Sequence, residues 1–94
     1  MTKKPLILVT NDDSISAPGI KVLTDIAIDF GEVWVVAPDS PMSGKGHAIS
    51  LDVSLRVNEV KSTGPQKEFK VSGTPADCVK LAVNKVLPRR PDLI

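Results

Sequence analysis

The chain has 94 residues, of which 41% are hydrophobic and 24% charged, values close to those of soluble globular proteins. A net charge of +1 with one Trp, two Phe and no Tyr offers neither the basic face nor the stacking platform that nucleic-acid polymers require. No apolar run approaches the ~20 residues of a membrane span, and no signal peptide is recognisable. We therefore expect a single cytoplasmic domain over residues 1–94 that binds neither nucleic acid nor a membrane.

Residues 6–37 are expected to form a strand, a helix and a second strand. Residues 6–9 are continuously apolar, which is typical of a strand buried on both faces. Pro18 then opens a helical pattern that Gly31 ends. Its apolar stripe, which we expect to be buried, consists of Ile20, Leu23, Ile26, Ala27 and Phe30. A second apolar strand follows over residues 33–37, and this order predicts parallel pairing of the two strands.

A change of period marks the middle of the chain. Apolar and polar residues alternate from Ala48 to Val57, the pattern of a half-exposed strand. A turn at residues 62–65 and a short returning strand at residues 68–71 follow. We interpret residues 48–71 as a small antiparallel insert, an excursion from the parallel sheet. The fold class is therefore α/β and Rossmann-like, with a mainly parallel sheet and flanking helices.

The last third of the chain predicts a second helix and a third parallel strand. Thr74 is the candidate N-cap, Pro75 takes the first helical position, and Asp77 adds a favourable charge in the first turn. The expected buried face consists of Val79, Ala82, Val83 and Val86. Cys78, the single cysteine, is interpreted as a core residue of this helix rather than a nucleophile. Residues 92–94 begin a strand, and the chain's end there reads as a truncation.

Asn11, Asp12 and Asp13 follow directly on the first strand. In open α/β sheets ligands bind outside the carboxyl ends of the strands, and adjacent carboxylates there suit a divalent cation and a phosphate. The same three residues are also ordinary turn formers, because their side chains bond to nearby backbone. Position alone leaves both interpretations open.

A second polar loop, residues 39–47, follows the second strand and is expected to lie beside the acidic loop. Ser43 could offer a hydroxyl to a cation, and Gly44 would let backbone N–H groups approach an anion. His47, the only histidine, could neutralise a phosphate. The alternative is a flexible turn with a surface histidine. The loop lacks the ending and spacing of a P-loop, and no G-x-G-x-x-G follows the first strand. Residues 72–74 could bind an anion at the start of the second helix, but we favour plain capping as their role.

The chain closely resembles the SurE survival-protein family of metal-dependent nucleotidases. The resemblance is carried by Ile7-Leu8-Val9-Thr10-Asn11-Asp12-Asp13, Val36-Ala37-Pro38-Asp39, Ser43-Gly44-x-Gly46-His47-Ala48-Ile49, Ser72-Gly73-Thr74-Pro75-Ala76-Asp77-Cys78-Val79 and Pro91-Asp92-Leu93-Ile94. It implies a phosphatase acting on nucleoside 5′-monophosphates, a homo-oligomer in the full-length protein, and Mg²⁺ or Mn²⁺ held by Asp12, Asp13 and Ser43. Asp13, or less favourably Asp12, would orient or deprotonate a water. We also expect Asn11 to order the loop by side-chain hydrogen bonds, and Asn11, Gly44 and His47 to bind the substrate.

Two departures from the family pattern matter. The family usually has Gly where this chain has Ser14, and a positive φ there would cost Ser of order 1 kcal/mol. The family also continues past the third strand into a Ser-Gly-x-Asn loop whose Asn completes the metal shell, and this chain ends before that loop. We therefore do not expect the isolated chain to be active.

Two other functions stay open from the residues alone. Receiver domains of signalling proteins also place paired acids after their first strand, but they need a phosphoacceptor Asp after the third strand and a later Lys. They also lack a long antiparallel insert. The other alternative is a catalytically silent fragment that folds or associates through its exposed sheet edge.

Overall fold

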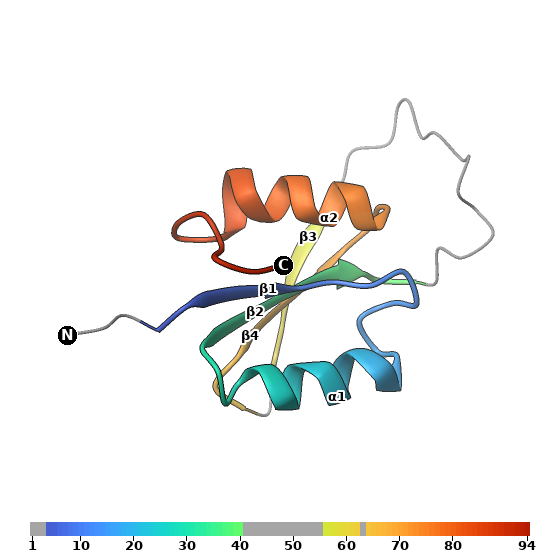
Figure 1. Cartoon of the computed structure of the whole chain (residues 1–94). Helices are drawn as coiled ribbons and strands as arrows, with labels where there is room; N and C mark the ends of the chain where they lie inside the picture. Colours follow the sequence, from blue (N-terminus) through green and yellow to red (C-terminus); the bar gives the residue numbers. More distant parts are fainter. Residues whose placement is uncertain (1–3, 41–55, 63) are drawn as a thin grey trace.

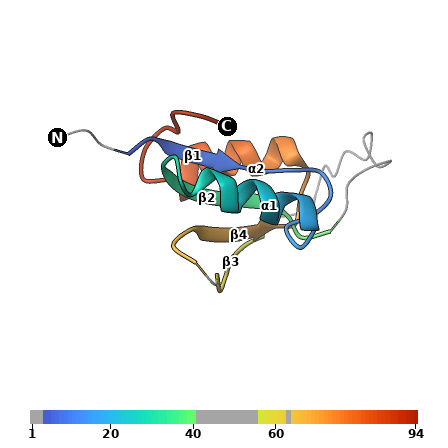
Figure 2. The same cartoon turned by 60° about the horizontal axis from the view of Figure 1, so that its bottom comes forward.

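A four-stranded mixed sheet forms the centre of the computed structural model, which describes residues 4–40, 56–62 and 64–94. The strands are β1 (Leu6–Val9), β2 (Glu32–Pro38), β3 (Val57–Val60) and β4 (Lys67–Val71), in the spatial order β1-β2-β4-β3. Figure 2 shows them succeeding one another in this order. β1 pairs parallel with β2, β2 pairs parallel with β4, and only β3 runs antiparallel to its neighbour.

The two helices cover opposite faces of the sheet. Helix α1 (Pro18–Ala27) lies on one face, and α2 (Pro75–Leu81) lies on the other and runs on into the π-helical segment η1 (Ala82–Val86) (Figure 1). Because side chains alternate along a strand, Val35 of β2 joins the core under α1 while Val36 joins the core under α2. Each core is therefore built from alternate residues of the same buried strands. None of the helices in the described ranges has the length and hydrophobicity needed to cross a membrane.

The strands expected at residues 6–9, 33–37 and 68–71 are confirmed, and one pairing differs from expectation. β1 and β2 are parallel neighbours, as the strand-helix-strand order predicts. The antiparallel pair is present between β3 and β4, whereas residues 48–55 of the expected insert lie outside the described residues. The pair is not an excursion, because β4 lies beside β2 in parallel register, with Val36 opposite Phe69. Local alternation identifies a strand but cannot identify its partner.

The expected apolar stripe of α1 is only partly buried, which corrects the prediction. Ile20 and Ala27 lie in the core, and the third buried position is polar Thr24, whose hydroxyl donates to the Ile20 carbonyl at 2.7 Å. The other three members of the stripe are exposed by half or more, namely Leu23 (50%), Ile26 (54%) and Phe30 (69%). The sheet extends only to β1 on that side, so nothing described covers these side chains.

Gly31 joins α1 to β2 where the backbone passes close to Pro5. A Cβ at this position would clash with the Pro5 carbonyl oxygen, which accepts a hydrogen bond from the Glu32 N–H at 2.8 Å. Helix α1 ends at Ala27, before Gly31, and the close approach of Pro5 gives the reason for glycine at position 31.

Helix α2 begins with a reciprocal cap. The Asp77 N–H donates to Thr74 Oγ1 at 3.2 Å, and the Thr74 N–H donates to Asp77 Oδ2 at 3.0 Å. These bonds confirm Thr74 as the N-cap of the helix and Asp77 as the acidic residue of its first turn. Cys78 and Ala82 are fully buried and Val79 and Val86 pack around them. Val83 is only half-buried and is not part of this core. A π-helical hydrogen bond joins the Leu87 N–H to the Ala82 carbonyl in this segment.

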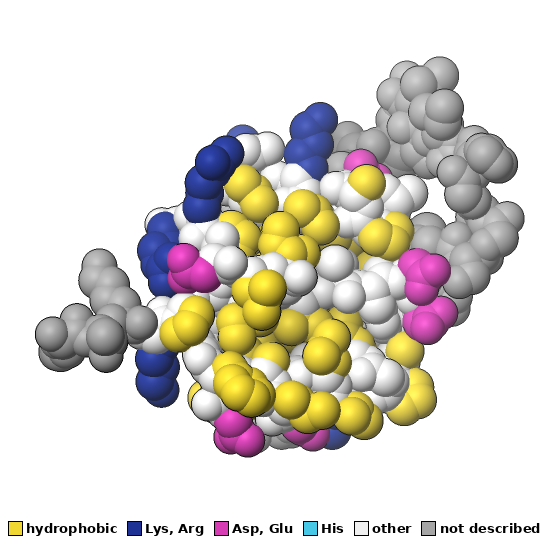
Figure 3. Space-filling view, in the orientation of Figure 1, with side chains coloured by type: hydrophobic (Ala, Val, Ile, Leu, Met, Phe, Trp, Pro, Cys, Tyr) yellow, Lys and Arg dark blue, Asp and Glu magenta, His cyan; other side chains and the backbone are white. Residues whose placement is uncertain are grey.

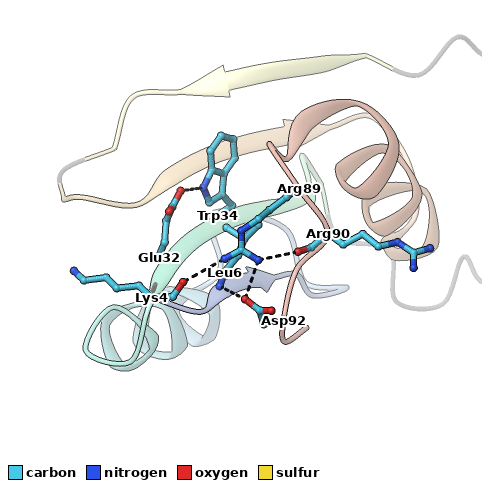
Figure 4. Close-up of polar contacts among 7 residues, drawn as sticks. All are labelled: Lys4, Leu6, Glu32, Trp34, Arg89, Arg90 and Asp92. Atoms are coloured by element: carbon cyan, nitrogen blue, oxygen red, sulfur yellow. Dashed lines mark hydrogen bonds and ion pairs between the residues drawn. The ribbon is translucent and has the colours of Figure 1, made fainter. Parts of the chain in front are cut away.

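Residues 92–94 return to the sheet beside β1. Leu93 forms an isolated parallel bridge with Ile7, and the Leu8 N–H donates to the Leu93 carbonyl at 2.9 Å. Asp92 anchors this segment through its contacts with the Leu6 N–H and with Arg89 (Figure 4). The predicted third parallel strand is therefore present as its first pairing only.

Candidate functional site

Hydrogen bonds join successive loops at the carboxyl ends of the parallel strands. The Ile15 N–H donates to the Pro38 carbonyl at 2.8 Å, which ties the loop after β1 to the end of β2. The Asp39 N–H donates to the Val71 carbonyl at 2.9 Å, which ties the end of β2 to the end of β4. The acidic loop, Asp39 and the start of α2 therefore lie along one edge of the sheet, as predicted from topology.

The acidic loop presents both of its carboxylates to solvent. Asp12 and Asp13 are exposed, whereas Ser14, which follows them, is buried. The Asn11 Nδ2 group donates to the Ser14 carbonyl at 2.9 Å, and the Ala17 N–H donates to the same carbonyl at 3.1 Å. The Asn11 side chain thus orders the loop, in agreement with the role expected from sequence. This arrangement leaves the two carboxylates accessible to a ligand.

Ser14, which stands where the family usually has Gly, adopts the positive φ that carries a conformational cost for a residue other than glycine. Its φ is 90°, and it is the only non-glycine residue with positive φ in the described ranges. Its hydroxyl lies 3.3 Å from Ser16 Oγ and accepts from the Ser16 N–H at 3.3 Å, so two long contacts accompany the conformation. The loop therefore holds strain directly beside the carboxylates, which is where functional sites commonly hold it.

The donor set of the loop suits a hard divalent cation. Asn11 Oδ1 is buried and has no hydrogen-bond partner, a costly state for an amide oxygen unless a cation or water satisfies it. Together with the carboxylates of Asp12 and Asp13 it supplies oxygen ligands of the kind that Mg²⁺ and Mn²⁺ prefer. No group of three or more His, Cys, Asp or Glu side chains in the described ranges could hold a metal by itself. The loop thus fits part of a cation site.

The polar side chains at the start of α2 stabilise the first turn of the helix. The Thr74 hydroxyl is occupied by the cap, which confirms the capping interpretation of this residue. Burial raises the pKa of the Cys78 thiol from 9.0 to about 12, and the negative charge of Asp77 adds to the increase. A thiol with this pKa is a poor nucleophile, which confirms the interpretation of Cys78 as a core residue.

Asp39 was not singled out as a site residue from sequence. Its carboxylate is exposed at the end of β2 and, like Asp77, it acts electrostatically on the Cys78 thiol. The signal that could have identified it is the one used for Asp12, an acid directly after a buried strand.

Three of the residues proposed from sequence, Ser43, Gly44 and His47, lie outside the described residues, so their roles stay predictions. The described residues nearest to them in the chain are Ser40 and Arg56. Ser40 follows the carboxyl end of β2, and the Arg56 N–H donates to Ser72 Oγ at 2.8 Å.

Comparison with known proteins gives a consistent result. The family model described as "Survival protein SurE" matches residues 7–94. A protein of Christiangramia forsetii named 5′-nucleotidase SurE is 56% identical over 93 residues, which are 97% of this chain and 36% of that protein. One of the same name from Flavobacterium psychrophilum is 55% identical over 91 residues, with 96% and 35% covered.

A solved structure agrees with the sequence comparisons. The crystal structure of the SurE protein from Aquifex aeolicus superposes with a TM-score of 0.78 at 35% identity, covering 95% of this chain and 36% of that one. The chain spans about a third of the length of each of these relatives. The matched fold and the matched residues, which include the acidic loop, lead to one conclusion: the chain belongs to the SurE family.

Proposed function

We propose that the protein acts, in its full-length form, as a divalent-metal-dependent phosphomonoesterase that hydrolyses nucleoside 5′-monophosphates. The observation that carries the proposal is the acidic loop. Asp12 and Asp13 stand exposed at the carboxyl end of β1 in a chain 56% identical to a protein named 5′-nucleotidase. The same match favours this function over a receiver-like module. Because the chain covers about a third of its relatives, the activity is assigned to the whole protein and not to these 94 residues.

The residues of the proposed site hold the metal, order the loop or contact the substrate. Asp12, Asp13 and Ser43 would hold Mg²⁺ or Mn²⁺. The bound ion supplies stabilisation of negative charge on the phosphoryl oxygens and lowers the pKa of a nearby water. Asn11 holds the loop in shape through its bond to the Ser14 carbonyl. Gly44 and His47 contact the substrate phosphate in this proposal.

The chemistry assigned to the carboxylates is proton transfer. Asp13 orients a water and accepts its proton as the water oxygen bonds to phosphorus. The bond between phosphorus and the 5′ oxygen breaks, and that oxygen takes up a proton from solvent water or from protonated Asp13, so that the nucleoside leaves as an alcohol. The products are a nucleoside and inorganic phosphate. Exposure of the carboxylates is consistent with this role, because substrate and water must both reach them.

The test uses a chimera in which residues 1–94 are followed by the part of the Christiangramia forsetii relative that lies beyond the matched region. We expect release of phosphate from nucleoside 5′-monophosphates with Mn²⁺ and none with chelator. Asp12→Asn and Asp13→Asn should each lower kcat/KM at least about 100-fold, the scale of a general acid–base contribution. Asp25→Asn, which changes an exposed acid of α1, is the matched control.

Turnover that is insensitive to chelator, or full activity in Asp12→Asn, would contradict the metal mechanism. Equal melting temperatures of the three variants would show that lost activity is not lost folding. Binding of Mn²⁺ by the 94-residue chain, measured by calorimetry and weakened in Asp12→Asn, gives a readout that is independent of turnover.

A further inference from the structure

A polar cleft separates α1 from β4 on one face of the sheet. Helix α1 packs on β1 and β2, and β4 and β3 lie to one side of it (Figure 2). The side of α1 toward β1 is apolar, and hydrophobic side chains gather on that face (Figure 3). The α1–β4 cleft lies on the other side, between residues 15–25 and the group Lys61, Gln66 and Glu68, with Val35 of β2 at its floor. Its volume of about 230 Å³ is below the ~300 Å³ at which pockets for drug-sized ligands begin, so it suits a small metabolite better than a nucleotide.

The α1 wall of the cleft offers hydrogen-bond donors. The N-cap residue of α1 is Ala17, which makes no side-chain capping bond, and no acidic residue stands in the first turn. Because Pro18 has no N–H, the donors that this end of the helix leaves without an intrahelical partner are the amides of Gly19 and Ile20. Lys21 follows them and lines the cleft. An uncapped start of a ten-residue helix beside an ammonium group favours a carboxylate of the ligand.

The β4 wall of the cleft offers acceptors. Gln66 is 6% exposed, and its Nε2 group donates to Glu68 Oε2 at 2.7 Å. This bond leaves Gln66 Oε1 as the acceptor of the amide, and it is buried without a hydrogen-bond partner, a costly state unless a donor satisfies it. Glu68 is half-buried and adds a carboxylate to the same wall. Amide and carboxylate oxygens accept hydrogen bonds only, so this wall favours an ammonium group of the ligand.

The charges around the cleft decide between a ligand of one sign and a ligand of both. Two cationic and two anionic side chains line it, namely Lys21, Lys61, Asp25 and Glu68. None of the four takes part in an ion pair between described residues. A simple anion or a simple cation would meet two opposite charges and two like charges. A ligand that carries both signs can place each of its charged groups beside an opposite one.

We propose that the α1–β4 cleft binds a small zwitterion of the α-amino-acid class. Its carboxylate lies at the start of α1, and its ammonium group lies toward Glu68 and Gln66 Oε1. Buried Ile20 and Val35 supply the apolar surface for its aliphatic part. The proposal goes beyond the phosphatase function and does not depend on it, because the ligand contacts neither Asp12 nor Asp13.

The first test titrates the 94-residue chain with the standard amino acids, one at a time, and follows its backbone amide signals by NMR. We expect at least one amino acid to bind with a Kd of about 1 mM or lower and to shift the signals of Gly19 and Ile20. The carboxamide of that amino acid and its analogue without the amino group each lack one of the two charges. Each should bind at least about 10-fold more weakly, because one charged hydrogen bond is lost. Absence of binding by every amino acid, or undiminished binding of either analogue, would overturn the proposal.

The second test places the ligand in the cleft by substitution. Glu68→Gln removes the carboxylate but can still accept from Gln66 Nε2, and it should raise the Kd at least about 10-fold. Lys21→Gln, at an exposed position of α1, is a second variant with the same expectation. The matched control is Glu59→Gln, which should leave the Kd unchanged. Glu59 stands opposite Phe69 in the β3–β4 pair and so faces the other side of the sheet from Glu68.

Equal effects of Glu68→Gln and Glu59→Gln on the Kd would overturn the proposal, and equal melting temperatures of the variants would show that folding is retained. The same titration of the chimera described above extends the test to the longer protein. An unchanged Kd there supports the site. Loss of binding would show that the rest of the protein covers the cleft and would also overturn the proposal.

Discussion

The Asp92 carboxylate accepts a hydrogen bond from the backbone N–H of Leu6 at 2.8 Å, although 86 positions of the chain separate the two residues. The same oxygen lies 3.0 Å from Arg89 Nη1, and the other terminal nitrogen of Arg89 donates to the Lys4 carbonyl (Figure 4). The bond from Leu6, followed by the interaction with Arg89, lowers the pKa of Asp92 from its ordinary value of 3.8. An exposed carboxylate thereby connects both ends of the described fold.

This relationship predicts a pH-dependent contribution of Asp92 to stability. Because the folded pKa lies below the unfolded one, the stabilisation is complete above the unfolded value and is lost as pH falls through the folded pKa, below 3.8. Thermal melts of the wild type and Asp92→Asn should therefore differ at neutral pH and converge in acid. Asp25→Asn serves as the control. A difference between wild type and Asp92→Asn that does not change with pH would contradict the assignment.

Ser14→Gly should stabilise the protein. A non-glycine residue at φ 90° carries a conformational cost of about 1–3 kcal/mol, which glycine avoids at the expense of greater freedom in the unfolded chain. The hydroxyl contacts that would be lost are long, at 3.3 Å. We expect a gain of about 1 kcal/mol in the free energy of unfolding, measured by urea denaturation. Ser14→Ala keeps the strain and loses the contacts, so it should not stabilise; a gain equal to that of Ser14→Gly would show that strain is not the cause.

Thr74→Ala should destabilise the protein by about 1 kcal/mol, the usual cost of removing an N-cap. The alanine cannot accept from the Asp77 N–H, which would then lose its partner at the start of α2. Thr74→Ser retains the hydroxyl and should stay within about 0.5 kcal/mol of wild type in chemical denaturation. If both substitutions had the same effect, loss of the Thr74 methyl group and not of the cap would be responsible.

The Cys78 thiol should be almost inert in the folded protein. It is fully buried, and its pKa of about 12 leaves very little thiolate at neutral pH. Alkylation by iodoacetamide should be slow in buffer and should accelerate with urea in proportion to the unfolded fraction. Rapid labelling under native conditions would contradict both the burial and the raised pKa. Cys78→Ala measures the packing contribution separately and should cost about 1 kcal/mol.

The parts of the fold that were predictable from sequence are those whose cause is local. The continuous apolar run of β1 and the Thr74 cap depend on neighbouring residues, and the structure confirms both. The position of the acidic loop at the sheet edge followed from a general rule about parallel strands. The family pattern usually has Gly at position 14, so the resemblance identified Ser14 as a residue that would be strained if its φ were positive. Its φ is 90°.

The parts that were not predictable depend on distant partners. The alternation before Val71 indicated strands, but the parallel pairing of β4 with β2 is set by residues some thirty positions away. Burial of Leu23 and Ile26 was expected from helical spacing, yet spacing shows only which side chains share a face and not what lies opposite that face.

The bridge between Ile7 and Leu93 also has a consequence for the order in which the protein is made. β1 emerges from the ribosome first, but the hydrogen bonds on its outer edge form only after Leu93 has been synthesised. Throughout that interval an apolar strand with an unpaired edge is exposed to other nascent chains, the condition under which misassembly is most frequent. Lysines before this strand (Lys3, Lys4) and aspartates after it (Asp12, Asp13) bring like charges together only when two copies pair parallel and in register, so they oppose that pairing.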